Sequence, residues 1–315
     1  MTTFFLNRLA TEPHALAFAG QSTPWPVALA DQTTDPSLDE ALRGHVAAAG
    51  RLLTPVAADL LATTGRPVDL FGFAPNPARL GAAADATASV EGVALTQLGA
   101  LLDLEHLGYS VAQAKPLAVL GHSQGVLAVH MTRAIEAAGS IEAAGKTLNE
   151  ILAVAALIGA AGTRRVRELG LNPKYGEASP MLSVKGATRE QVEALVARVN
   201  NARGPISIAV TNSDNHHVLS GYPEDLAAFA LEAEREHQHQ AKLREQKLHG
   251  GTVFNPTLEY LEVTLPFHSP LMADAVEQTV AWAGACGFDQ KRTRALAEEV
   301  LLNHVDCCLL YTSPS

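Results

Sequence analysis

The segment GHSQG, residues 121–125, is the part of the sequence whose residue types and spacing most directly indicate chemistry. It fits the G-x-S-x-G pattern, in which a serine stands on a sharp turn between a buried strand and a helix. Both neighbours are present, because residues 116–121 predict a strand and residues 125–138 predict a helix. The glycines allow strand and helix to approach closely, and the start of the helix provides partial positive charge for a developing oxyanion. We therefore predict that Ser123 is a nucleophile.

A serine hydroxyl is a weak nucleophile unless a neighbouring base takes its proton. Among the 12 histidines, His268 stands in PFHSPLM, residues 266–272, where two prolines predict a rigid turn after a strand. A histidine held in this way suits a general base, and we predict that it pairs with Ser123. The other histidines considered are interpreted as structural or solvated, namely His122 on the sharp turn, His216 and His217 in a strand, and His237 and His239, which do not share a helix face.

The first predicted strand, residues 14–20, ends in a turn at Gly20-Gln21 whose backbone can face the serine across the sheet. We expect the backbone N–H groups of Gln21 and Gln124 to form an oxyanion hole. A plain turn is the competing interpretation.

No part of the sequence has the pattern of a metal or nicotinamide site. It contains no HxxEH, no Cys/His array, and no GxGxxG after a strand. We therefore expect no metal and no tightly bound cofactor. The three cysteines form neither a CxxC nor a disulfide framework, which is typical of a reducing, cytoplasmic compartment.

Strands that alternate with helices predict an α/β fold with a parallel sheet, similar to that of α/β-hydrolases. Further helices are predicted over residues 37–65, 93–107 and 291–304. The apolar run at residues 151–162 is too short to cross a bilayer, so we interpret it as a buried helix and expect no membrane partner.

Residues 181–263 have a different pattern, strand-helix-strand-strand-helix-strand, which predicts a ferredoxin-like subdomain inserted into the core. The core then comprises residues 1–180 and 264–306. Residues 307–315 continue neither pattern, and we expect them to be a non-native or truncated tail.

The charge balance disfavours nucleic acid as a partner. The chain of 315 residues has 33 acidic and 23 basic residues, which gives a net charge of −10. An acidic surface repels a phosphate backbone. The first 20 residues also lack the layout of a signal peptide.

Taken together and in this order, these motifs resemble the acyltransferase domain of type I fatty acid synthases of fungi and actinobacteria. The resemblance runs from about His14 to His304 and rests on GQ after the first strand, GHSQG, the NSDNHHVLSG segment, and PFHSPLM. It implies an N-terminal fragment of a synthase and the acyl carrier protein acyltransferase fold.

The resemblance also implies an acetyltransferase that loads Ser123 from acetyl-CoA, with His268 as base, and passes the acetyl group to the phosphopantetheine thiol of an acyl carrier protein domain. The implied partners are a coenzyme A thioester, the carrier domain and the other synthase domains. Gly20, Asn212 and Ile158 are the implied substrate-binding positions.

Ile158 bears on the choice of substrate. Relatives that transfer malonyl groups carry an arginine at this place, which binds the malonyl carboxylate in a bidentate manner. Without a cation, burial of a carboxylate costs on the order of several kcal/mol, so we expect acetyl to be preferred. Arg164 and Arg165 lie two turns further on and are interpreted as surface or coenzyme-phosphate contacts.

Family members orient the catalytic histidine with a backbone carbonyl from a last strand that follows a D/E-x-G-P-G turn. No such motif occurs here, so the resemblance implies that the strand with this carbonyl is missing.

Three other functions stay open at this point. A malonyl or palmitoyl transferase would share the fold, although Ile158 argues against malonyl. An α/β-hydrolase esterase would need an aspartate between serine and histidine, where Asp214 is the candidate, and an HGGG segment, which the sequence lacks. The third is an inactive structural segment of a synthase.

Overall fold

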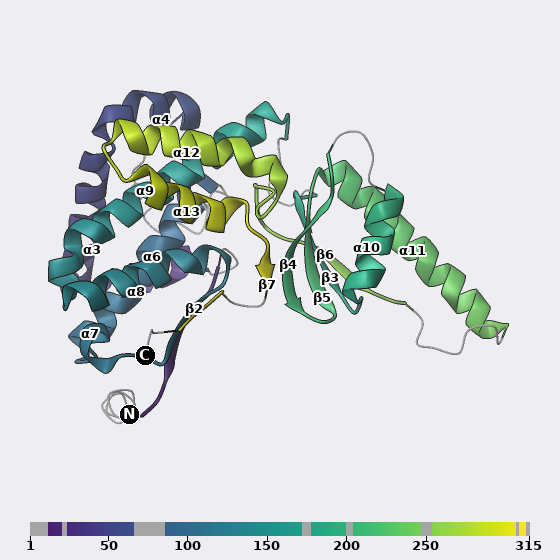
Figure 1. The fold of residues 1–315 in the computed structure, drawn as a ribbon, viewed down its shortest axis with the longest axis horizontal. Helices are drawn as coiled ribbons and strands as arrows, with labels where there is room; N and C mark the ends of the chain where they lie inside the picture. The colour runs from purple at the N-terminus through teal and green to yellow at the C-terminus, as the bar shows by residue number, and fades with distance from the viewer. Residues whose placement is uncertain are drawn as a thin grey trace.

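The computed structural model describes residues 12–20, 24–65, 86–171, 178–199, 204–246, 254–306 and 309–312. Figure 1 shows two parts side by side, a mainly helical core and a smaller sheet covered by two helices. This arrangement agrees with the predicted α/β class and ferredoxin-like subdomain.

The sheet of the core begins with the two strands expected from sequence. Strand β1 (Ala15–Phe18) runs parallel to β2 (Ala118–Gly121), with Phe18 opposite Gly121. A third strand, β8 (Leu309–Thr312), pairs antiparallel with β2. The expectation that residues 307–315 are a non-native or truncated tail stays a prediction, because this pairing does not bear on their origin. Pairing of backbone groups, which depends little on side-chain pattern, makes this strand.

Helices surround this sheet. The two most buried ones, α6 (Ala86–His106) and α9 (Ile141–Glu168), pack against each other in the middle of the core. In α9 (Ile141–Glu168), residues 151–162 are all buried, as the sequence predicts. Helix α9 is apolar and long enough to cross a membrane, but 67% of its most apolar window is buried inside the protein, as in a core helix. The other core helices are α2 (Trp25–Gln32), α3 (Pro36–Leu52), α4 (Ala57–Thr64), α7 (Val111–Ala114), α8 (Val126–Ala138), α12 (Ala273–Ala285) and α13 (Gln290–Leu301).

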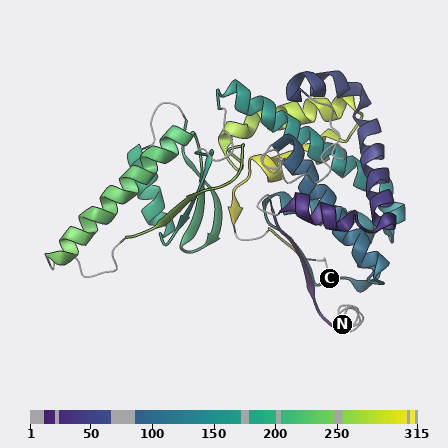
Figure 2. The same cartoon turned by 180° about the vertical axis from the view of Figure 1, so that it is seen from behind.

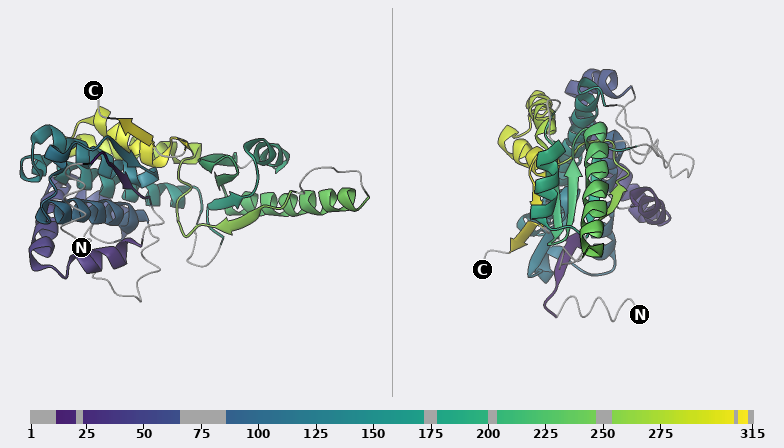
Figure 3. Two further views of the ribbon diagram at one scale, coloured as in Figure 1. Left: turned by 90° about the horizontal axis from the view of Figure 1, so that it is seen from below. Right: turned by 90° about the vertical axis from the view of Figure 1, so that its right-hand side faces the viewer.

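The smaller part has the element order of a ferredoxin-like unit. Its elements are β3 (Met181–Lys185), α10 (Arg189–Val199), β4 (Ser207–Ser213), β5 (His216–Ser220), α11 (Pro223–Glu245) and β6 (Thr257–Tyr260). The strands lie in the order β6-β3-β5-β4 and pair antiparallel. Apolar side chains from the sheet and both helices form a hydrophobic cluster of their own, and α11 reaches away from the core (Figures 2 and 3).

A fifth strand joins this smaller sheet from outside residues 181–263. Strand β7 (Val305–Asp306) follows α13 and pairs parallel with β4, with Val305 opposite Val210. In Figure 1 it lies between the helical core and the smaller sheet. Residues 264–306 therefore do not serve the core alone, because the open edge of β4 gives the backbone of β7 hydrogen-bonding partners.

Candidate active site

Ser123 stands on the predicted turn between strand and helix. Strand β2 ends at Gly121, a short 3-10 turn spans Ser123–Gly125, and α8 follows at once. The backbone of Ser123 has φ of 53°, in the left-handed region that non-glycine residues rarely adopt. Glycine is needed beside it, because a Cβ on Gly125 would overlap the carbonyl oxygen of Phe18. The tight approach of β1 to the turn therefore holds Ser123 in this conformation.

His268 contacts Ser123 although the two residues are far apart in the sequence. Ser123 Oγ lies 2.8 Å from His268 Nε2, although 145 positions separate the two residues. His268 also has a positive φ, 56°, and only 3% of its surface is exposed. Both members of the pair thus depend on strained backbone that the surrounding structure holds in place.

The second ring nitrogen of His268 determines where its proton lies. His268 Nδ1 is 2.8 Å from the carbonyl oxygen of Asn303. A carbonyl can only accept, so Nδ1 carries the hydrogen and donates it. In the neutral imidazole Nε2 then has a lone pair directed at the Ser123 hydroxyl, which is the arrangement that a general base requires.

Burial keeps this imidazole neutral. Loss of hydration, together with the smaller effects of nearby His122 and His304, lowers the pKa of His268 from 6.5 to about 4. The Asn303 carbonyl acts in the opposite direction and raises the pKa. At neutral pH His268 is therefore able to accept a proton.

The carbonyl of Asn303 corrects one expectation from the sequence. The orienting carbonyl was expected on a strand that the chain lacks, yet it lies within the chain, directly after α13. Sequence reasoning missed Asn303 because a backbone carbonyl leaves no residue signature, and the expected Gly-Pro turn is absent here.

Gly20, Gln124 and Asn212, three other predicted positions, lie at this turn or contact it. Gly20 is in contact with it, because a Cβ there would lie 2.8 Å from the carbonyl oxygen of His122. Gln124 follows Ser123 and is fully buried. Asn212, on β4, accepts a hydrogen bond through Oδ1 from His122 Nε2 at 3.0 Å. Gln21 lies outside the described residues.

Ile158 and the two arginines lie on α9. Ile158 is fully buried. Arg164 contacts Glu168 and Gln278 at the surface. Arg165 forms an ion pair with Asp274 at 2.8 Å and donates through Nε to the carbonyl oxygen of Leu271.

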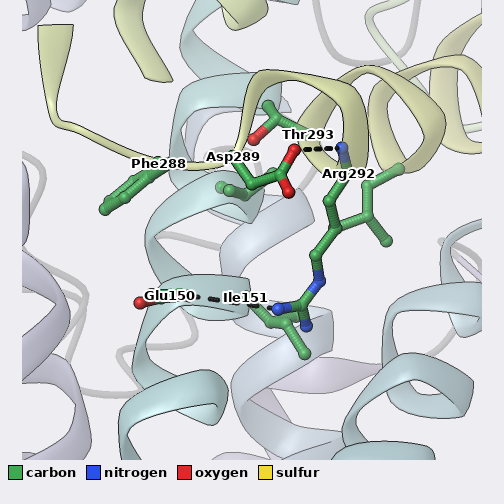
Figure 4. A pocket seen from close by; sticks show the side chains of 8 residues that line it. Glu150, Ile151, Phe288, Asp289, Arg292 and Thr293 are labelled. Carbon is green, nitrogen blue, oxygen red and sulfur yellow. Dashed lines mark hydrogen bonds and ion pairs between the residues drawn. The ribbon is translucent and has the colours of Figure 1, made fainter. Parts of the chain in front are cut away.

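The described residues offer no metal site, and a pocket among them does not include the Ser123–His268 pair. Within the described residues, no group of three His, Cys, Asp or Glu side chains could hold a metal ion. A pocket between α9 and α13 is lined by Glu150, Phe288, Asp289 and Arg292 among others, and Arg292 lies 3.9 Å from Glu150 (Figure 4). Neither Ser123 nor His268 lines this pocket.

Comparison with known proteins agrees with the resemblance seen in the sequence. Residues 180–260 match the family described as "Fatty acid synthase central AT domain". "Fatty acid synthase 2" of Mycosarcoma maydis is 32% identical over 170 residues, which are 50% of this chain and 4% of that protein. "Fatty acid synthase beta subunit TOXC" of Cochliobolus carbonum is 29% identical over 163 residues, 47% of this chain and 8% of that protein. The chain thus spans less than a tenth of the length of these two relatives.

Solved structures extend the likeness in fold to nearly the whole chain. An acyl carrier protein S-malonyltransferase from Vibrio cholerae has a TM-score of 0.59 at 14% identity, covering 94% of this chain and 84% of that one. A malonyl-transacylase solved in complex with a type II acyl carrier protein has a TM-score of 0.60 at 15% identity, covering 94% and 83%. The chain therefore has the fold of acyl carrier protein acyltransferases, and its residues 180–260 are similar to the central AT domain of fatty acid synthases.

Proposed function

We propose that this protein transfers an acetyl group from acetyl-CoA to the phosphopantetheine thiol of an acyl carrier protein domain, through an acetyl ester on Ser123. The observation that carries the proposal is the contact of Ser123 Oγ with His268 Nε2 at 2.8 Å, while Asn303 holds the opposite ring nitrogen. The names of the fatty acid synthase relatives and of the transacylase with the same fold support an acyl carrier protein as the acceptor, and the coenzyme A thioester as donor is part of the proposal.

In the first half-reaction, His268 Nε2 takes the hydroxyl proton as Ser123 Oγ attacks the thioester carbonyl. The negative charge that develops on the carbonyl oxygen faces the start of α8, where the N–H of Gln124 is the proposed donor together with that of Gln21. Collapse of the tetrahedral intermediate breaks the C–S bond, and the proton on Nε2 passes to the leaving sulfur of coenzyme A.

The second half-reaction is the reverse with another thiol. His268 removes the proton from the phosphopantetheine thiol, whose sulfur attacks the ester carbonyl. The C–O bond to Ser123 breaks, and Oγ recovers its proton from Nε2. Water must stay out, because it would hydrolyse the same ester. The low exposure of His268 supports this requirement.

The preference for acetyl over malonyl is proposed on the basis of Ile158. Its fully buried apolar side chain has no charge for a carboxylate. On the same helix, Arg164 forms an ion pair with Glu168 and Arg165 forms one with Asp274. The solved relatives named for malonyl transfer are alike in fold only, so they do not decide this point.

The wider assembly and location are also proposals. The names of the relatives support association with the carrier domain and other domains of a synthase. A tightly bound cofactor plays no part in the proposed steps, and a cytoplasmic location stays a prediction from cysteine usage.

Intact mass spectrometry after mixing with acetyl-CoA tests the proposal. We expect one acetyl group on the parent and none on Ser123→Ala. Absence of acetyl from the parent, or its persistence on Ser123→Ala, would contradict the proposal.

The same assay tests the substrate class. Malonyl-CoA should load at least about tenfold less readily than acetyl-CoA, which corresponds to about 1.4 kcal/mol. Ile158→Arg should shift the ratio toward malonyl. Equal loading of both thioesters, or an unchanged ratio in the variant, would remove the argument from Ile158 and favour the malonyl or palmitoyl alternative.

The esterase alternative receives less support from the geometry. An α/β-hydrolase triad needs a carboxylate on the histidine, but His268 Nδ1 faces the Asn303 carbonyl and Asp214 lies in the turn between β4 and β5. An esterase would release acetate from acetyl-Ser123 within seconds, whereas a transferase keeps the ester until a thiol arrives. An inactive structural segment would never form it.

A further inference from the structure

His304 links the orienting carbonyl to the smaller sheet. It directly follows Asn303, whose carbonyl holds His268. His304 Nδ1 lies 2.7 Å from the carbonyl oxygen of Ile208, so Nδ1 donates there. His304 Nε2 lies 3.3 Å from Thr211 Oγ1, so these two contacts of the ring are both with β4.

The backbone after His304 is attached to the same strand. Val305 pairs with Val210 in the parallel ladder between β7 and β4. The side-chain contacts of His304 and this ladder therefore hold the segment with the Asn303 carbonyl to β4 from two directions. In Figure 1, β7 lies beside β4 at the side of the smaller sheet that faces the core.

The nucleophile has a matching link to β4. His122, the residue before Ser123, donates from Nε2 to Asn212 Oδ1 at 3.0 Å. Asn212 lies four residues along β4 from Ile208. One strand of the ferredoxin-like subdomain thus contacts the residue adjacent to the nucleophile and the residue adjacent to the orienting carbonyl.

We infer that β4 positions the Ser123–His268 pair and that His304 is the positioning residue through which it orients the base. This inference rests on the proposed function. His304 acts through Asn303 and His268 and does not itself touch the reacting atoms. Because a displacement of about 1 Å in a catalytic group can cost about 100-fold in rate, a hydrogen bond that sets this position has a measurable effect.

The subdomain then has a role in the chemistry of the Ser123–His268 pair. A shift of β4 relative to the core would displace the serine turn through Asn212 and the histidine carbonyl through His304. The Ser123–His268 distance would therefore report on the placement of the subdomain.

The test compares His304→Ala with a matched control, His237→Ala. His237 is also partly buried, and its Nδ1 also lies 2.7 Å from a backbone carbonyl, that of Phe254, but it contacts neither β4 nor the pair. The readout is the rate at which Ser123 is labelled by a fluorophosphonate, a reaction that forms the Oγ–P bond and expels fluoride. We expect His304→Ala to slow labelling at least about tenfold and His237→Ala to stay within about twofold of the parent.

Two further variants separate positioning from general loss of structure. The amide nitrogen of His304→Asn can take the place of Nδ1, so this variant should recover most of the rate by donating to Ile208. In a His268→Ala background, the added His304→Ala change should have no further effect, because the base through which it acts is gone.

The outcomes distinguish this inference from the proposed function. If the parent is labelled rapidly but does not load acetyl-CoA, the proposed substrate fails while the positioning role is still tested by the variants. If His304→Ala labels at the parental rate, slows no more than His237→Ala, or slows the His268→Ala background equally, the inference is overturned.

Discussion

Ser123 and His268 both have a strained backbone, but different parts of the molecule hold each of them in place. Ser123 and His268 have φ values of 53° and 56°. The strain at Ser123 is held by neighbours in its own motif and by β1, whose Phe18 leaves room only for glycine at position 125. His268 is held by a carbonyl 35 positions later, on a segment attached to another sheet. The glycines of a local motif make room for the strained Ser123, whereas the group that orients His268 lies outside the PFHSPLM segment and reaches it only through the fold.

Among these variants, His268→Ala should have the largest effect on the rate of acetyl loading, because it removes the base. Loss of the proton acceptor is expected to slow acetyl loading of Ser123 by about 100-fold to 10,000-fold, because general base catalysis contributes this much. Stopped-flow or timed mass spectrometry measures the rate. Loading near the parental rate would show that another group takes the proton.

Gly125→Ala should disturb the turn that holds the nucleophile, Ser123. The added methyl group would overlap the Phe18 carbonyl, and overpacking of this kind costs about 1–3 kcal/mol of stability, with the serine turn displaced. Gly145→Ala is the matched control, because nothing lies within 4 Å of a Cβ at this position in α9. Thermal unfolding should show a loss for the first variant and none for the second, and a Gly125→Ala variant as stable and active as the parent would contradict the role of the close approach.

The pH dependence of loading sharpens the description of the base. Burial lowers the pKa of His268 to about 4, so the neutral, active form predominates above that pH. We expect the rate to stay level from pH 7 to about 5 and to fall with a midpoint near 4. A solvated histidine would lose activity near 6.5, and that midpoint would contradict the buried environment.

The free energy of unfolding also depends on the protonation of His268, so it is measured at each pH together with the loading rate. Below pH 6.5 the imidazole of the unfolded chain binds a proton, whereas that of the folded chain does not until about pH 4. The unfolded state therefore binds more protons in this window, and the free energy of unfolding falls as the pH falls from 6.5 to 4. Circular dichroism at each pH distinguishes this loss from titration of the active site.

Asn303→Ala should have the smallest effect, within about twofold on loading. His268 contacts the backbone carbonyl, and the Asn303 side chain is exposed. A large loss of rate would mean that the side chain, and not the carbonyl, orients the base.

The sequence by itself determined the local features of this protein. Apolar runs, glycines and prolines predict β1, β2, the Ser123 turn, α8 and α9, and the alternating pattern after residue 181 predicts the ferredoxin-like unit. These features depend on residues that are close in the chain, so the signal lies within a short window. The residues PFHSPLM marked His268 as a candidate base for the same reason.

Only the tertiary structure shows which groups orient the Ser123–His268 pair. The Asn303 carbonyl, the pairing of β7 with β4 and that of β8 with β2 all use backbone atoms, which every residue carries, so no residue type announces them. The contacts of His304 with Ile208 and Thr211 join segments about 95 positions apart, and only the packing of the two parts brings them together. Side-chain pattern specifies the elements, but backbone hydrogen bonds between distant elements set the geometry of the site.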